Sequence, residues 1–130
     1  MFSHVTVGVT DFETAFAFYN TLLGAPGLDL KFREDDRPWA GWKAPDADRP
    51  LFVINAPFHG QPATTGNGSM TAFLASSRPQ VDAAYRAAMA AGAVSEGKPG
   101  LRPEYHANYY GAYFRDPDGN KLCVCTHGIR

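Results

Sequence analysis

Cysteine is scarce in this sequence: 130 residues contain two, Cys123 and Cys125. On a strand, residues two apart point the same way with Cα atoms roughly 6.5 Å apart, which is poor geometry for a disulfide. The sequence therefore excludes a fold held together by disulfides. It favours a reducing compartment, so we expect a cytoplasmic protein.

An excess of charge of either sign is also missing. Lys and Arg number 12 against 13 for Asp and Glu, which gives a formal net charge of -1. Such a balance provides no electrostatic surface for nucleic acid or an anionic membrane. No apolar run approaches the roughly 18 residues of a membrane span, and the first residues lack the basic segment of a signal peptide. We expect no nucleic-acid partner and no membrane association.

Turn-forming residues, in contrast, are frequent. The 13 Gly and 10 Pro make up about one residue in six, while 45% of the chain is hydrophobic. The length and the apolar content suit a single packed domain, which we assign to residues 1–130. The turn residues predict short strands and helices rather than long ones.

The first half of the chain predicts a strand, a helix and three strands. Val5, Val7 and Val9 alternate with small or polar residues, as in a half-buried strand. Thr10 and Glu13 have the spacing of a capping box, and apolar residues recur at helical spacing from there to a stop at Gly24. Three short apolar segments then read as strands, at residues 29–32, 39–43 and 51–56.

The second half repeats this order after a Gly- and Thr-rich linker at residues 60–69. A strand is expected at 70–75. Ser77 and Gln80 mark a helix start, and Gly92 marks its end. The last strands are expected at 94–95, 109–115 and 121–126, the final two joined by a strong turn sequence.

We interpret this as two βαβββ modules, at about residues 1–60 and 68–130. The alternative is two unrelated βα segments in one α+β domain. A module this small cannot bury its sheet face alone, so the two sheets are expected to merge into one open, cup-shaped mixed sheet. Both helices would cover the outside and leave a concave inner face.

The residues that carry a family resemblance lie in both halves. Residues 4–11 (HVTVGVTD), 18–19 (FY) and 22–24 (LLG) resemble the first module of the vicinal oxygen chelate superfamily. Residues 116–122 (DPDGNKL) are similar to the signature that opens its last strand. The superfamily holds glyoxalase I, bleomycin-resistance proteins and extradiol dioxygenases. The resemblance implies paired βαβββ modules, a site inside the cup and a homodimer.

The resemblance also implies four inward ligands for a divalent metal such as Zn, Ni, Fe or Mn. His4 occupies the first position, but residues 51–53 (LFV) offer no ligand at the second. Met70 replaces the usual His at the third position and Cys123 the usual Glu at the fourth. This incomplete set disfavours a metal and leaves His4 as the one expected ligand. Without a metal, His4, Met70 and Cys123 are expected to contact the substrate. The alternative for His4 is a hydrated or hydrogen-bonded polar residue at the start of a strand, and the alternative for Cys123 is a small buried side chain. Further imidazoles that could complete a site are His59, His106 and His127.

Residues 97–110 concentrate reactive side chains in a predicted loop. Arg102 could clamp a carboxylate or phosphate, and Tyr105 could contact the same ligand. His106 and Tyr110 are candidate catalytic residues for proton transfer near neutral pH. The competing interpretation is an ordered loop whose tyrosines pack on the edge of the sheet.

Two functions of different classes fit these features. The first is an enzyme of the glyoxalase or dioxygenase type, with lyase, isomerase or oxygenase chemistry at a degenerate metal site. The second is a metal-free protein that binds or sequesters a small molecule, as in the bleomycin-resistance branch. Trp42 is expected to line the cup for a planar ligand, unless it belongs to the core.

Overall fold

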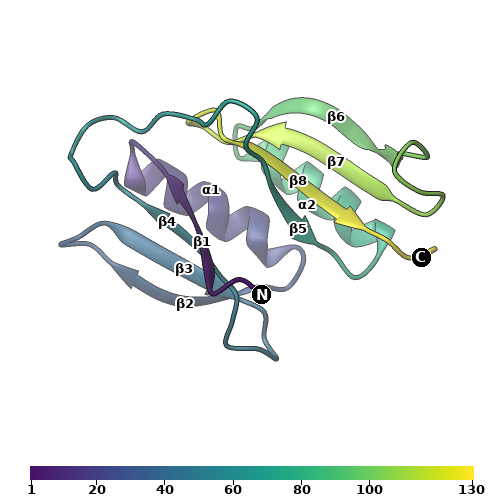
Figure 1. The fold of residues 1–130 in the computed structure, drawn as a ribbon, viewed down its shortest axis with the longest axis horizontal. Helices are drawn as coiled ribbons and strands as arrows, with labels where there is room; N and C mark the ends of the chain where they lie inside the picture. Colours follow the sequence, from purple (N-terminus) through teal and green to yellow (C-terminus); the bar gives the residue numbers. More distant parts are fainter.

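A computed structural model describes all 130 residues and contains two successive series of one strand, one helix and three strands (Figure 1). This order confirms the expected α+β class with two βαβββ modules. Neither helix has the length and apolar character needed to cross a membrane. Along the chain the elements are β1 (His4–Gly8), α1 (Phe12–Gly24), β2 (Asp29–Glu34), β3 (Trp39–Lys43), β4 (Leu51–Asn55), β5 (Thr71–Leu74), α2 (Arg78–Ala90), β6 (Val94–Leu101), β7 (Tyr110–Arg115) and β8 (Lys121–Thr126).

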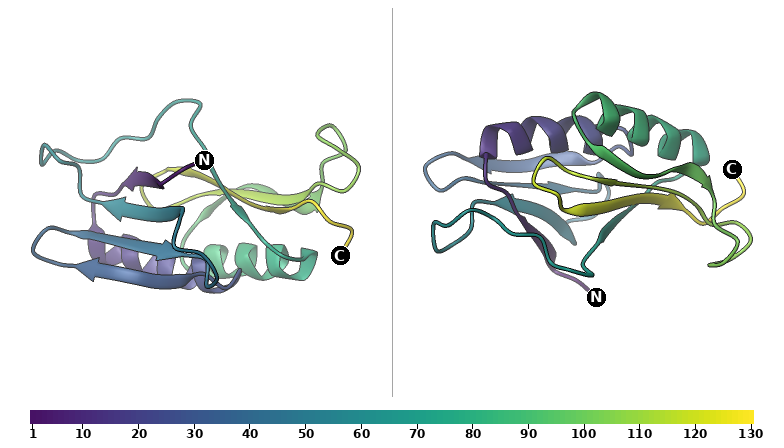
Figure 2. Two further views of the ribbon diagram at one scale, coloured as in Figure 1. Left: turned by 60° about the horizontal axis from the view of Figure 1, so that its bottom comes forward. Right: turned by 90° about the horizontal axis from the view of Figure 1, so that it is seen from above.

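The strands form two four-stranded sheets with the same topology. Their orders are β1-β4-β3-β2 and β5-β8-β7-β6. In each sheet the first and last strands of the module pair in parallel, and the other pairs are antiparallel. Both helices lie on one side of the sheets, and the chain between β4 and β5 passes on the opposite side (Figure 2). We call the sheet face opposite the helices the open face.

The strands of the two modules are not hydrogen-bonded to one another, so the expected open mixed sheet consists of two four-stranded sheets rather than one continuous one. Side chains of the turn before β8 join the modules instead. The Asn120 side-chain amide donates to the carbonyl oxygen of Gly8 at 3.0 Å, and Oδ1 of Asp118 accepts from the backbone N–H of Thr10 at 2.9 Å. These bonds link the end of β1 and the loop that follows it to the turn before β8, and they satisfy backbone groups of both.

Strand alternation decides which residues face the helices and which face outward. In β8, Leu122 and Val124 belong to the core, so Cys123 and Cys125 point to the open face. The core is shared by both modules. Phe52 and Phe73, from β4 and β5, pack edge to face with ring centroids 4.9 Å apart. The open face is therefore backed by one packed interior.

Two local expectations need correction. Helix α1 is capped by Asp11, whose side chain accepts from the Thr14 N–H, while the Thr10 hydroxyl accepts from Ala63 in the linker. Asp and Thr are both favourable N-cap residues, so the adjacent Thr10 and Asp11 leave the predicted start of the helix uncertain by one residue. Strand β6 runs to Leu101 rather than ending at residue 95, because bulges accommodate its glycines without ending the pairing with β7.

Candidate functional site

The open face of the second module carries a connected group of tyrosine and cysteine side chains. Tyr109 lies just before β7 and its ring covers Gly111; a Cβ at Gly111 would lie 2.9 Å from Cε1 of that ring. The Tyr109 hydroxyl is 2.9 Å from the Tyr113 hydroxyl and 3.5 Å from Sγ of Cys123. Glycine at position 111 thus lets the phenol fold back over the sheet and reach the thiol.

These contacts change the acidity of each group. Burial raises the pKa of Tyr113 to about 12, and burial with a hydrogen bond to Cys123 raises the pKa of Tyr109 above its ordinary range. The neighbouring side chains of Cys123, Tyr109 and His127 lower the pKa of Cys125 to about 6. The pKa of Cys123 is raised by its contact with Cys125 and by burial. The phenols therefore remain hydrogen-bond donors at neutral pH, and Cys125 is the thiol of the pair with the lowered pKa.

A pair of histidines adjoins this group. His106, from the loop between β6 and β7, and His127, just after β8, stack with ring centroids 5.1 Å apart. Nε2 of His106 is 2.9 Å from Nδ1 of His127, and Nε2 of His127 is 3.9 Å from Sγ of Cys125. The loop and the end of the chain therefore meet beside the thiol.

A cleft of about 670 Å³ opens on the same face, between the linker and strands β7 and β8. Lys121 has its Nζ 5.9 Å from the centroid of the Tyr113 ring, and the Arg102 guanidinium carbon lies 5.4 Å from it. All ion pairs in the structure involve Arg33 or Arg115, so these two cations have no acidic partner. Besides linker residues 65–69, the cleft is lined by Met70, Tyr105, Tyr113, Arg115 and Lys121.

Arg102 is held in place by the backbone of β6. Its Nη2 donates to the carbonyl oxygen of Lys98 at 2.8 Å. A Cβ at Gly97 or at Gly100 would come within 3.1 Å of the guanidinium nitrogens, so the two glycines make room for the group. Nη1 also donates to the carbonyl oxygen of Leu101 at 3.4 Å. The guanidinium N–H groups that these two bonds do not use can bind an anion.

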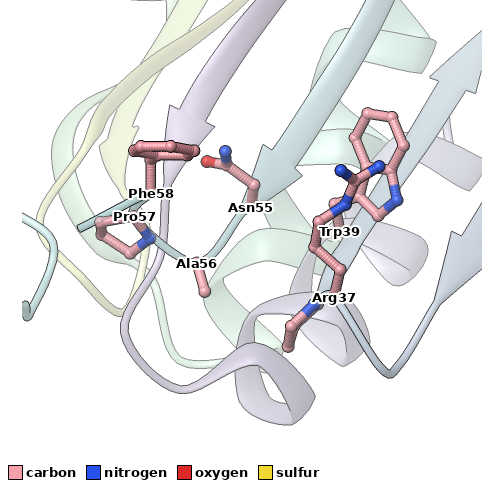
Figure 3. A pocket seen from close by; sticks show the side chains of 7 residues that line it. Arg37, Trp39, Asn55, Ala56, Pro57 and Phe58 are labelled. Atoms are coloured by element: carbon pink, nitrogen blue, oxygen red, sulfur yellow. The ribbon is translucent and has the colours of Figure 1, made fainter. Parts of the chain in front are cut away.

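The first module has a separate cleft of about 490 Å³, which contains no acid, thiol or imidazole (Figure 3). The Arg37 guanidinium carbon lies 4.9 Å from the centroid of the Trp39 ring. Asn55 and the fully exposed Phe58 lie across from this pair (Figure 3). This cleft offers stacking and one cation but no group that would move a proton.

The structure brings five of the expected site residues to the open face of the second module. Met70 and Tyr105 line the large cleft, and Arg102 lies against Tyr113 beside it. Cys123 contacts Tyr109, and His106 contacts His127.

Three other expected site residues lie elsewhere. Tyr110 faces the helices, where its hydroxyl donates to Asp82 of α2 at 2.7 Å, so it does not join His106. That bond, followed by burial, raises the pKa of Tyr110. Trp42 is 1% exposed in the core and does not line a cleft. His4 is exposed at the start of β1, with Nδ1 2.9 Å from the Ser3 hydroxyl.

The side chains at the four family ligand positions do not fit a divalent metal. His4 pairs in register with Leu51, an aliphatic residue, and Met70 and Cys123 supply only sulfur atoms. No group of three or more His, Cys, Asp or Glu side chains in the structure is arranged to hold a metal ion. Open sites for substrate oxygens use three protein ligands, commonly imidazole or carboxylate. His4 therefore has no partners with which to form the implied site.

Two residues of the open face were not among the expected site residues. Lys121 and Cys125 alternate with Cys123, so the period of the last strand could have placed them on one face. Tyr109 was also missed, although it alternates with Gly111 and Tyr113 in the predicted strand at 109–115 and its ring covers Gly111 on the open face.

Comparisons with known proteins agree with this architecture. The family described as the Glyoxalase/Bleomycin resistance protein/Dioxygenase superfamily matches residues 1–124. A glyoxalase/bleomycin resistance protein from Albidiferax ferrireducens T118 has a crystal structure similar to this one, with 41% sequence identity and a TM-score of 0.84. The match covers 98% of this chain and 99% of that chain. No curated protein matches the sequence.

More distant structures share the fold. A glyoxalase/bleomycin resistance protein/dioxygenase family enzyme from Burkholderia phytofirmans PsJN is 20% identical with a TM-score of 0.71, over 97% of this chain and 98% of that one. A glyoxalase-related enzyme from Fulvimarina pelagi is 17% identical with a TM-score of 0.73, over 97% and 87%.

Proposed function

Because the chain belongs to the Glyoxalase/Bleomycin resistance protein/Dioxygenase superfamily, we propose that it binds a small organic anion in the cleft beside Tyr113. The binding does not depend on a metal. The ligand has a planar or apolar body, which contacts the phenol rings, and a carboxylate or similar group, which meets the cations. This is the metal-free binding function rather than the lyase, isomerase or oxygenase function of a metal site.

The observation that carries the proposal is the pair of cations beside Tyr113. Arg102 and Lys121 each lie within 6 Å of the ring centroid, and neither has an acidic partner. Two unpaired like charges at one aromatic ring are complementary to a bound anion. Arg115 also lines the cleft but is neutralised by Glu96, with Nε 2.7 Å from Oε1.

The donor set at the family ligand positions supports the metal-free form. Of those four positions only His4 offers an imidazole, and it lies at the start of β1 in the first sheet. A carboxylate in the cleft would be recognised by charge and by hydrogen bonds instead. The homodimer implied by the family resemblance stays a prediction, which light scattering would test.

A titration with a matched pair of probes tests the proposal. Benzoate carries the charge and benzamide is its neutral counterpart of the same shape. We expect benzoate to bind in the presence of EDTA, and benzamide to bind about five- to tenfold more weakly, as for the loss of one charge-assisted contact. Isothermal titration calorimetry measures both.

Variants then locate the ligand. Lys121→Met and Arg102→Gln should each weaken benzoate binding about five- to tenfold. Arg37→Gln is the matched control, since Arg37 lies in the first-module cleft. The proposal fails if benzoate does not bind, if both probes bind equally, or if Arg37→Gln is the only variant that weakens binding.

A further inference from the structure

Hydrogen-bond directions define a chain that ends at Cys125. The backbone N–H of Asn108 donates to Nδ1 of His106 at 3.2 Å. The proton of neutral His106 is therefore on Nε2, which donates to Nδ1 of His127 at 2.9 Å. Neutral His127 then has its proton on Nε2, and that N–H faces Sγ of Cys125 at 3.9 Å. The sulfur is presented with a donor, which favours the thiolate over the thiol.

The surroundings distinguish Cys125 from its neighbour. Both cysteines are buried, but Cys125 is 5% exposed, whereas Cys123 has no exposed surface, and Cys125 lies beside the exposed His127. Leu74, which pairs in register with Cys125 on β5, is 70% exposed. A small molecule approaching the thiol pair thus meets Cys125 first and finds an apolar side chain next to it.

The titratable groups that face Cys125 come from three segments. Its own strand contributes Cys123, the residue before β7 contributes Tyr109, and the end of the chain contributes His127, backed by His106. The neighbouring strands add no charge at this level, since β5 presents Leu74 and β7 presents Gly111. No carboxylate opposes ionisation of the thiol, and every polar neighbour can donate to it.

We infer that Cys125 is a nucleophile that forms covalent adducts with small α,β-unsaturated carbonyl compounds, held as a thiolate by His127 with His106 as a positioning residue. The thiolate sulfur bonds to the β-carbon, and the electron pair of the carbon–carbon double bond moves to the α-carbon and carbonyl oxygen. The resulting enolate takes a proton from water, so a thioether and hydroxide are formed. No leaving group departs and no oxidant is needed. This activity does not rest on anion binding in the cleft.

The rate of adduct formation with N-ethylmaleimide between pH 5 and 9 tests the inference. Intact mass follows the rate, peptide mapping locates the adduct, and glutathione is the reference thiol. We expect a single adduct on Cys125, with a rate that is half-maximal near pH 6. At pH 6 the protein should react about tenfold faster than glutathione, because its larger thiolate fraction outweighs the lower reactivity of a less basic thiolate.

Three histidine variants separate the roles. His127→Ala removes the donor, so the labelling rate at pH 6 should fall about fivefold or more and its midpoint should rise. His106→Ala should shift the midpoint in the same direction by less, because His127 loses only its fixed tautomer. His59→Ala is the control, since His59 bonds to Gln61 in the linker, and should change nothing.

Each contrary result overturns the inference. The contrary results are adducts on Cys123, a pH midpoint of labelling near that of glutathione, and identical labelling rates for His127→Ala and His59→Ala. A further contrary result is that neither N-ethylmaleimide nor the smaller acrylamide labels the native protein under conditions that label the urea-unfolded chain. Circular dichroism of each variant establishes that it is folded before labelling.

Discussion

The hydroxyl of Tyr19, on α1, donates a 2.5 Å hydrogen bond to Oδ2 of Asp116, in the turn before β8. The other oxygen of Asp116 accepts from the backbone N–H groups of Asp118 and Asn120. Asp116 is 3% exposed, so its carboxylate is satisfied by the protein rather than by water. One buried side chain thus shapes the turn and connects it to the helix of the other module.

Removing this hydroxyl should destabilise the protein. Tyr19→Phe leaves a buried carboxylate with one donor fewer, at a cost of about 1–3 kcal/mol in the free energy of unfolding. Urea denaturation measures the change. Tyr85→Phe is the matched control, since Tyr85 donates to Ser95 at an exposed site, and it should cost less than about 1 kcal/mol. Equal losses in the two variants would contradict a special role for the Tyr19–Asp116 bond.

An added methyl group at Gly111 should disturb the open face. The new Cβ of Gly111→Ala would lie 2.9 Å from the Tyr109 ring and 3.3 Å from Cβ of Cys125. We expect a loss of about 1–3 kcal/mol from overpacking, measured by thermal or urea denaturation. Gly24→Ala is the control, because nothing lies within 4 Å of its Cβ and the site is helical. It should stabilise by up to about 1 kcal/mol, and the prediction fails if both variants behave alike.

Ionisation of Cys125 should make stability depend on pH. Its folded-state pKa is lowered to about 6, against about 8.5 for an unfolded cysteine. A lowered pKa contributes stability that is fully present above pH 8.5 and is lost as the pH falls through 6. The free energy of unfolding of the wild type, relative to Cys125→Ser, should therefore rise from pH 6 to pH 8.5. Urea denaturation at pH 5.5, 7 and 8.5 measures the difference, and a constant difference would exclude a lowered pKa.

Freeing a third cation should strengthen anion binding. Glu96→Gln removes the partner of Arg115, which lines the cleft with Lys121. Because the pair is partly exposed, we expect a modest gain in benzoate affinity of about two- to fivefold. The affinity for benzamide should not change, which separates charge from packing. Calorimetry that shows weaker benzoate binding in Glu96→Gln would place the anion away from Arg115.

The fold could be predicted because its signals are local. Alternation in β1 and β8, the Ser77 cap and the turn at residues 116–120 each act over a few residues. The separation into two sheets was not predictable. The bonds that join the two modules include the one from Asn120 to Gly8, 112 residues apart, and no local pattern encodes such contacts.

The candidate site was predicted in part, and strand register explains the rest. Tyr109 and Tyr110 are adjacent at the start of β7, and a shift of one residue exchanges the face that each occupies. The sequence assigned Tyr110 to the site, whereas in the structure Tyr109 lies on the open face and Tyr110 faces the helices. Trp39 and Trp42 differ in the same way, since odd positions of β3 face outward and Trp42 faces α1. Which of two similar residues points outward depends on the whole sheet.

The two modules share one core across their boundary. Phe52 of the first module packs on Phe73 of the second, and Tyr19 reaches Asp116 across the same boundary. The chain that joins the modules, at residues 56–70, contributes no helix or strand. A protein cut there into two fragments should leave each half with an uncovered apolar surface that only the other half fits. When the two fragments are mixed, they should associate non-covalently into the native fold although the linker is cut. The domain could then serve as a split reporter, whose two fragments signal when they are brought together.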